Sequence, residues 1–137
     1  MIIDGTDIII GRLAAYVAKK SLEGEKIDII NAEKTIITGS KKDVFGKYKH
    51  RRERGTPSAG PFFPRKANLI LKRTIRGMLP YKKSRGEEAL KRIKCFIGVP
   101  KIFEGKEFKT LKSLSIAKLE TKKYLTLSKL AKLLGAK

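Results

Sequence analysis

The side chains best suited to chemistry in this sequence are its arginines and lysines, which concentrate in the middle of the chain. Residues 41–94 hold 18 basic and four acidic side chains, whereas residues 1–40 hold five basic and six acidic ones. Arginine forks and lysine ammonium groups suit phosphate oxygens, and neutralising the phosphates of a nucleic acid releases counterions. We therefore predict a nucleic-acid-binding surface made of Lys47, Lys49, Arg51, Arg52, Arg54, Arg65, Lys66, Lys72, Arg73, Arg76, Lys82, Lys83 and Arg85.

The charge of the whole chain also favours a polyanionic partner. Its 33 basic and 13 acidic residues give a net charge of +20 and a pI near 10.2. Self-repulsion of this size is a cost for a compact monomer, which a polyanion would relieve. Nucleic acid is the first candidate, an anionic membrane surface is the second, and a solvated lysine-rich surface is the plain alternative. No helix-turn-helix, zinc-finger or RNP pattern occurs, so we expect recognition of shape and backbone.

Motifs of enzymes and metal sites do not occur at a usable spacing. His50 is the only histidine, and the cations around it would keep it neutral rather than prepare it as a base. His50 and Cys95 are too few and too far apart for a recognisable zinc cluster. The first predicted strand is not followed by GxGxxG, and the sequence has no GxxxxGK[ST]. We predict no catalytic residue, no metal ligand, no cofactor and no small-molecule substrate.

Two further features bear on the cellular setting. The sequence has no apolar run of 18 residues and no signal-peptide pattern, so we expect a soluble protein without a membrane partner. Its single cysteine, Cys95, cannot form an internal disulfide, which fits a reducing compartment. The expected location is the cytoplasm.

Helices must position most of these cations. Apolar residues recur at steps of three and four from Ala67 through Ile75 to Met78, which predicts an amphipathic helix with Met78 in the core and Arg73 and Arg76 on the other side. On this basis Met78→Asp should unfold the chain.

Two capping boxes predict the starts of the helices on either side. Ser40 indicates a helix over residues 41–53 and Ser84 one that starts at Arg85, because each serine is followed three residues later by an acidic residue. Between the first two helices, residues 55–64 contain two glycines and three prolines, which exclude helix and central strand. The adjacent Phe62 and Phe63 in this loop either pack onto the domain or stack on bases or a neighbouring protein.

A small α/β core should carry this basic middle. Residues 1–5 and 26–31 read as strands with a helix between them, which predicts a parallel pair with a right-handed crossover. The apolar run 94–98 is long enough for a buried strand and too short for a helix. We place the core at residues 1–100, with its basic middle at 41–94, and a C-terminal extension at 101–137 that ends in a short helix capped by Thr126.

Several motifs in order resemble the L13 family of large-subunit ribosomal proteins, in its archaeal type. They cover residues 1 to about 100 and comprise Gly11-Arg12-Leu13-Ala14, Asn31-Ala32-Glu33, Thr38-Gly39, Gly60-Pro61, Ile75-Arg76-Gly77-Met78-Leu79-Pro80 and Gly86-Glu87. The resemblance implies a three-layer α/β/α sandwich around a four-stranded parallel sheet, Rossmann-like without a dinucleotide motif. It also implies binding to large-subunit ribosomal RNA beside neighbouring ribosomal proteins, a role early in subunit assembly, and no catalysis.

Two other functions stay open at this point. One is an RNA-acting or nucleotide-binding enzyme, which a ligand pocket at the strand ends near Gly5, Asn31 and Gly98 would favour. The other is a DNA-compacting protein, which competition between duplex DNA and structured ribosomal RNA would separate from the ribosomal function.

Overall fold

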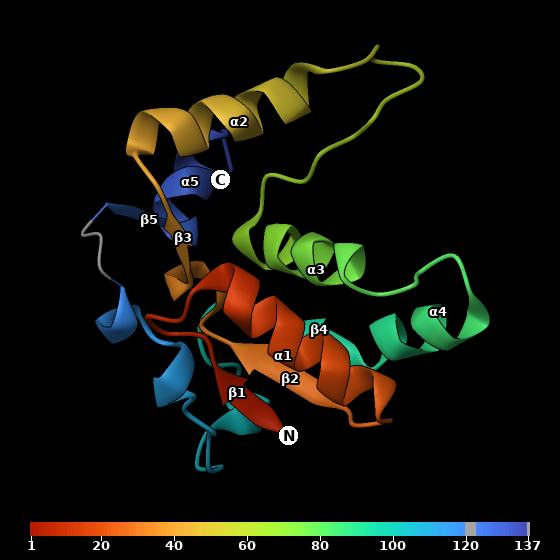
Figure 1. The fold of residues 1–137 in the computed structure, drawn as a ribbon, viewed down its shortest axis with the longest axis vertical. Helices are drawn as coiled ribbons and strands as arrows, with labels where there is room; N and C mark the ends of the chain where they lie inside the picture. Colours follow the sequence, from red (N-terminus) through yellow and green to blue (C-terminus); the bar gives the residue numbers. More distant parts are fainter. Residues whose placement is uncertain (120–122, 137) are drawn as a thin grey trace.

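The computed structural model describes residues 1–119 and 123–136 and confirms an α/β protein (Figure 1). Three strands, β1 (Ile2–Asp4), β2 (Ile27–Ile30) and β4 (Ile93–Cys95), form a parallel sheet in the order β1-β2-β4. Ile3 lies opposite Ile29, and Ile29 lies opposite Cys95. Isoleucines on all three strands are fully buried, so this sheet is the centre of the core.

The helix α1 (Ile10–Leu22) joins β1 to β2, as the strand–helix–strand pattern predicts. Its inner stripe, Leu13, Ala14 and Val17, is completely buried. The helix packs against both α3 (Ala67–Gly77) and α4 (Ser84–Lys91), and Figure 1 shows it in front of the parallel sheet with α3 beside it. The basic helix α3 is therefore held by a packed core.

The predicted four-stranded parallel sheet is wrong. The strand β3 (Ile36–Thr38) lies outside the three-stranded sheet and pairs antiparallel with β5 (Tyr124–Thr126). After β2 the chain turns away, because Asn31 adopts a left-handed φ of 52° and Ala32–Lys34 form a 3-10 turn. The two-residue period that marks a strand is not visible over the three residues of β5, so its pairing could not be read from the sequence.

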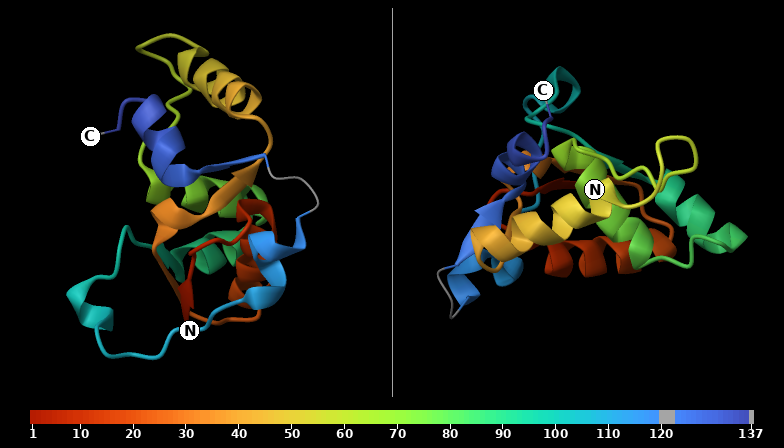
Figure 2. Two further views of the ribbon diagram at one scale, coloured as in Figure 1. Left: turned by 90° about the vertical axis from the view of Figure 1, so that its left-hand side faces the viewer. Right: turned by 90° about the horizontal axis from the view of Figure 1, so that it is seen from above.

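The C-terminal helix α5 (Leu127–Leu133) joins the same hydrophobic core as the sheet. Thr126 caps it, as predicted, by accepting a hydrogen bond from the backbone N–H of Lys129 at 3.4 Å. Leu127, Leu130 and Leu134 are buried, and β5 contacts the basic helix α2 (Lys41–Glu53). Figures 1 and 2 show α5 lying directly beside α2, so the last part of the chain supports this helix.

Of the two predicted serine caps, the structure contains one. Ser40 caps α2 by accepting from the Asp43 backbone N–H at 3.2 Å. Ser84 is instead the first residue of α4, whose N-cap is Lys83 without a side-chain hydrogen bond. Backbone bonds replace the cap, because the N–H of Lys83 donates to the Pro80 carbonyl and the turn is already closed.

The end of α3 also differs from the prediction. Met78, expected in the core, is 45% exposed, whereas the next residue, Leu79, is 4% exposed. The helix stops at Gly77 and Met78 is its C-cap, so the helical spacing no longer decides which side chain points inward. Met78→Asp is therefore no longer expected to unfold the chain. A charge at the buried Leu79 should have that effect instead.

Candidate nucleic-acid interface

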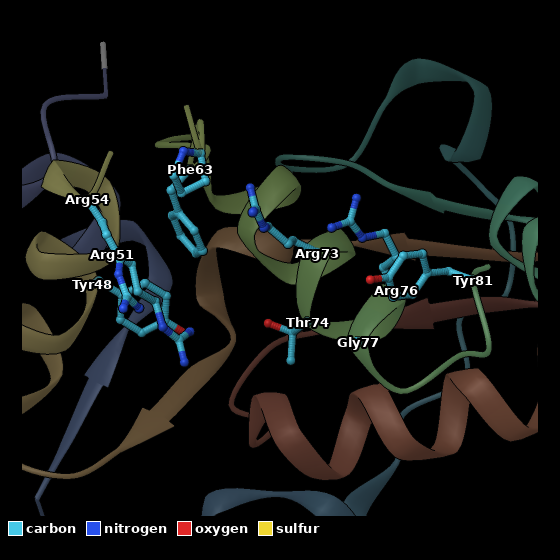
Figure 3. Close-up of a pocket in the computed structure, with 10 residues that line it drawn as sticks. Tyr48, Arg51, Arg54, Phe63, Arg73, Thr74, Arg76, Gly77 and Tyr81 are labelled. Atoms are coloured by element: carbon cyan, nitrogen blue, oxygen red, sulfur yellow. The ribbon is translucent and has the colours of Figure 1, made fainter. Parts of the chain in front are cut away.

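An open cleft of about 490 Å³ lies between α2 and α3, and four arginines line it (Figure 3). Arg51 and Arg54 lie at the C-terminal end of α2, and Arg73 and Arg76 lie on α3. We call this hollow the arginine cleft; its other lining residues are Tyr48, Pro61, Phe63, Thr74, Gly77 and Tyr81. None of the ten lining residues is acidic, so the cleft attracts anions.

The α2 wall consists of an aromatic ring with a guanidinium over it. Tyr48 and Arg51 are three residues apart on one side of the helix, and the Arg51 Cζ lies 5.5 Å from the centre of the Tyr48 ring. Burial raises the pKa of the Tyr48 phenol, although the nearby Arg51 lowers it in part. The phenol therefore stays neutral at physiological pH and adds no negative charge to the cleft.

The α3 wall repeats this arrangement twice. The Arg73 Cζ lies 4.7 Å from the centre of the Phe63 ring, and the Arg76 Cζ lies 4.9 Å from the centre of the Tyr81 ring. Arg73 also donates from Nη1 to the carbonyl of Phe62 at 2.7 Å. A guanidinium that lies over a ring can still donate hydrogen bonds from its N–H edge, so each pair restrains its arginine without using up all of its donors.

The loop of residues 55–64 closes one side of the cleft through a single aromatic residue. The rings of Phe63 and Tyr48 meet edge to face with their centres 5.6 Å apart, which ties the loop to α2. Arg73 holds the same loop from α3. Of the two uses considered for these phenylalanines, packing therefore applies to Phe63, whereas Phe62 is 70% exposed.

A glycine makes possible the turn that carries Tyr81. A Cβ atom on Gly86 would lie only 2.1 Å from the Pro80 carbonyl oxygen. The close approach of α4 to this turn therefore requires a residue without a side chain at position 86. This turn places the Tyr81 ring against Arg76 (Figure 3).

Two of the predicted cations lie at the end of α5 instead of in the cleft. Arg52 donates from Nη1 to the carbonyl of Leu134 at 2.6 Å, and its side chain is partly buried. The Arg65 guanidinium lies at the same place, 3.7 Å from where a Cβ on Gly135 would be. Cations suit the C-terminal end of a helix, where the last carbonyls are unpaired.

The other predicted cations surround the cleft. Lys72 lines a neighbouring hollow of about 280 Å³ together with Arg73 and Arg76, and Lys47 lines one of about 250 Å³ against β3. Lys49 pairs with Glu53 at 3.9 Å on the exposed side of α2. The remaining four are exposed at the start of α3 and around the start of α4, namely Lys66, Lys82, Lys83 and Arg85.

The aromatic part of this cleft was not predicted from the sequence. The helical pattern indicates only that Tyr48 faces the inner side of α2, and the charge pattern indicates only that Tyr81 lies in a basic turn. The usable signal was spacing, since Tyr48 precedes Arg51 by three residues and Tyr81 follows Arg76 by five. Phe63 gave no such signal, because its arginine partner is on another element.

A nucleotide-binding enzyme with such a sheet would hold its ligand at the carboxyl ends of the strands. At the ends of β1 and β2 this place is filled by the protein's own side chains. The Asp4 carboxylate accepts hydrogen bonds from the Thr6 N–H and hydroxyl, at 3.0 and 2.7 Å, and from Asn31 Nδ2 at 3.0 Å. Burial alone would raise the pKa of Asp4, but these hydrogen bonds outweigh it and lower the pKa. A Cβ on Gly5 would come within 2.9 Å of Thr35, so the turn is tightly packed.

The described part of the chain contains neither a metal-binding cluster nor a membrane-spanning helix. Over residues 1–119 and 123–136, no three His, Cys, Asp or Glu side chains are grouped so that they could hold a metal ion. Within the same ranges no helix is long and apolar enough to span a membrane.

Comparison with known proteins agrees with the resemblance seen in the motifs. The family model described as Ribosomal protein L13 matches residues 1–102. The chain belongs to the ribosomal protein L13 family. All residues that line the arginine cleft, from Tyr48 to Tyr81, lie inside the part of the chain that the family model matches.

Archaeal relatives extend the similarity over almost the whole chain. A protein of Archaeoglobus fulgidus called large ribosomal subunit protein uL13 is 45% identical over 135 residues, which is 98% of this chain and 86% of the relative. Proteins of the same name from Methanococcoides burtonii and Methanosarcina barkeri are 43% and 44% identical, and in each case the match covers 99% of this chain and 98% of the relative. The predicted archaeal type of the L13 family is thus confirmed.

Proposed function

We propose that this chain is a structural protein of the large ribosomal subunit in the cytoplasm, that it binds large-subunit ribosomal RNA through the arginine cleft and the cations around it, and that it supports an early step of subunit assembly. It contacts neighbouring ribosomal proteins and catalyses no reaction. The observation that carries the proposal is the cleft itself, in which four arginines from two helices converge and no acidic residue is part of the lining.

Family membership and charge support the same proposal. The archaeal relatives are named as large-subunit ribosomal proteins, and the net charge of +20 suits a polyanionic partner. The packed turn at Asp4 and Gly5 argues against the nucleotide-binding enzyme, because it fills the place where such an enzyme would hold its ligand.

The dependence of binding on salt tests the site. We expect Arg51→Ala with Arg76→Ala, one arginine from each wall, to weaken binding to purified large-subunit ribosomal RNA. The slope of log affinity against log salt should fall by about 0.7–0.9 for each phosphate that the variant no longer neutralises. Filter binding at several KCl concentrations measures both quantities.

The matched control removes the same charge elsewhere. Arg12 and Lys19 are exposed on α1, outside the predicted surface, so Arg12→Ala with Lys19→Ala should leave the slope nearly unchanged. Equal losses of affinity in the two double variants would mean that net charge alone, and no localised site, drives binding. Stronger binding to duplex DNA than to the ribosomal RNA at one salt concentration would favour the DNA-compacting alternative.

A further inference from the structure

We propose that the arginine cleft receives the base of one unpaired nucleotide, while the phosphates beside it bind the arginines at the rim. This inference rests on the proposed function and adds the kind of RNA element that the site recognises. It goes beyond the expectation of pure backbone recognition that follows from the charge pattern.

The aromatic lining is the first argument. A site for phosphates alone needs cations and N–H donors, yet Tyr48, Phe63 and Tyr81 also face this cleft. Tyr81 is 42% exposed, so its ring is accessible from solvent. Proteins hold unstacked RNA bases on aromatic rings and on the planes of arginine guanidinium groups, and both are present here.

The size and shape of the cleft are the second argument. Its volume of about 490 Å³ lies within the range of roughly 300–1,000 Å³ that small-molecule pockets span. In a duplex the faces of each base are covered by its neighbours, so a base can reach rings inside a pocket only when it leaves the stack. The cleft therefore fits an unpaired nucleotide better than a paired one.

A bare stretch of the lining is the third argument. Gly77, the last residue of α3, lines the cleft, and a Cβ added there would have no atom within 4 Å. Its backbone is helical, so the position tolerates a side chain without strain. The missing side chain leaves room on the α3 wall beside Thr74, next to the guanidinium groups of Arg73 and Arg76, where the plane of a base can lie (Figure 3).

Filling this space tests the inference while every arginine stays in place. Gly77→Leu should weaken binding to purified large-subunit ribosomal RNA by about tenfold, the effect expected when one stacked base is excluded. The salt slope should not change, because every phosphate-binding cation is retained. Thermal unfolding of the free variant checks that its fold is intact.

The control is the same substitution on the neighbouring helix. Gly46 is exposed on α2, has no atom within 4 Å of an added Cβ, and lies about 200° around the helix from Tyr48, facing away from the cleft. Gly46→Leu should bind like the wild type. Should Gly77→Leu fail to fold, Tyr81→Leu removes a ring with little change in volume and should show the same weakening at an unchanged slope.

A direct contact is detected by ultraviolet crosslinking of the wild-type complex. We expect a crosslink from Phe63 or Tyr81 to a nucleotide that is unpaired in the RNA, located by mass spectrometry and by reverse-transcription stops. Binding of Gly77→Leu within twofold of Gly46→Leu, or crosslinks only at residues outside the arginine cleft, would overturn the inference while the proposed function stands. A wild-type chain that does not bind the RNA would remove both.

Discussion

Individual arginines of this protein do different work although the sequence presents them as one set. Arg73 holds the 55–64 loop through the Phe62 carbonyl and the Phe63 ring, whereas Arg51 and Arg76 lie over tyrosine rings on opposite walls of the cleft. The density of basic residues predicted that all of these arginines bind phosphate, because charge can be read directly from the sequence. The partner of each guanidinium depends on tertiary structure and could not be predicted.

Adjacent residues at the end of α3 give a sharp test of the core. Leu79→Asp should lower the free energy of unfolding by at least about 3 kcal/mol, because it leaves an unpaired charge in the core. Met78→Asp should change it by no more than about 0.5 kcal/mol, because that side chain is exposed. Urea unfolding followed by circular dichroism measures both, and a larger destabilisation in Met78→Asp than in Leu79→Asp would show that the end of α3 is placed wrongly.

The long periodic helices and the strands of the parallel sheet were predictable, whereas the pairing of β3 with β5 was not. The stripe of Leu13, Ala14 and Val17 recurs over 13 residues of α1, and Ser40 correctly indicated the start of α2. The three-residue strands β3 and β5 carry no comparable pattern, and their antiparallel pairing joins segments almost 90 residues apart. The same pairing brings α5 against α2, so the C-terminal segment supports one wall of the cleft.

The link between α2 and α5 can be tested through Arg52. Its guanidinium donates to the Leu134 carbonyl, so Arg52→Ala should cost about 1–2 kcal/mol of stability and increase hydrogen exchange in α5. Lys47→Ala, at an exposed position of the same helix, should stay within about 0.5 kcal/mol of the wild type. The salt slope of RNA binding should stay unchanged in Arg52→Ala, and a fall of about 0.7–0.9 would show a phosphate contact instead of a structural bond.

The whole molecule combines a near-neutral N-terminal third with a strongly basic middle on one packed core. Residues 1–40 supply two strands of the parallel sheet and the buried stripe of α1, with five basic against six acidic side chains. Most of the excess charge lies on α2, α3, α4 and their connections, where it is available to a partner and repels itself in the free protein. This division explains how a chain with a net charge of +20 keeps a compact apolar centre.

Sedimentation of the protein in cell lysate tests the proposed function most directly. At physiological salt the wild-type chain should travel with the large ribosomal subunit and leave it only at high salt, because phosphate contacts hold it there. A variant without Arg51, Arg54 and Arg76 should shift toward the top of the gradient, while Arg12→Ala with Lys19→Ala should still travel with the subunit. A wild-type chain that stays at the top of the gradient at physiological salt would contradict the ribosomal function.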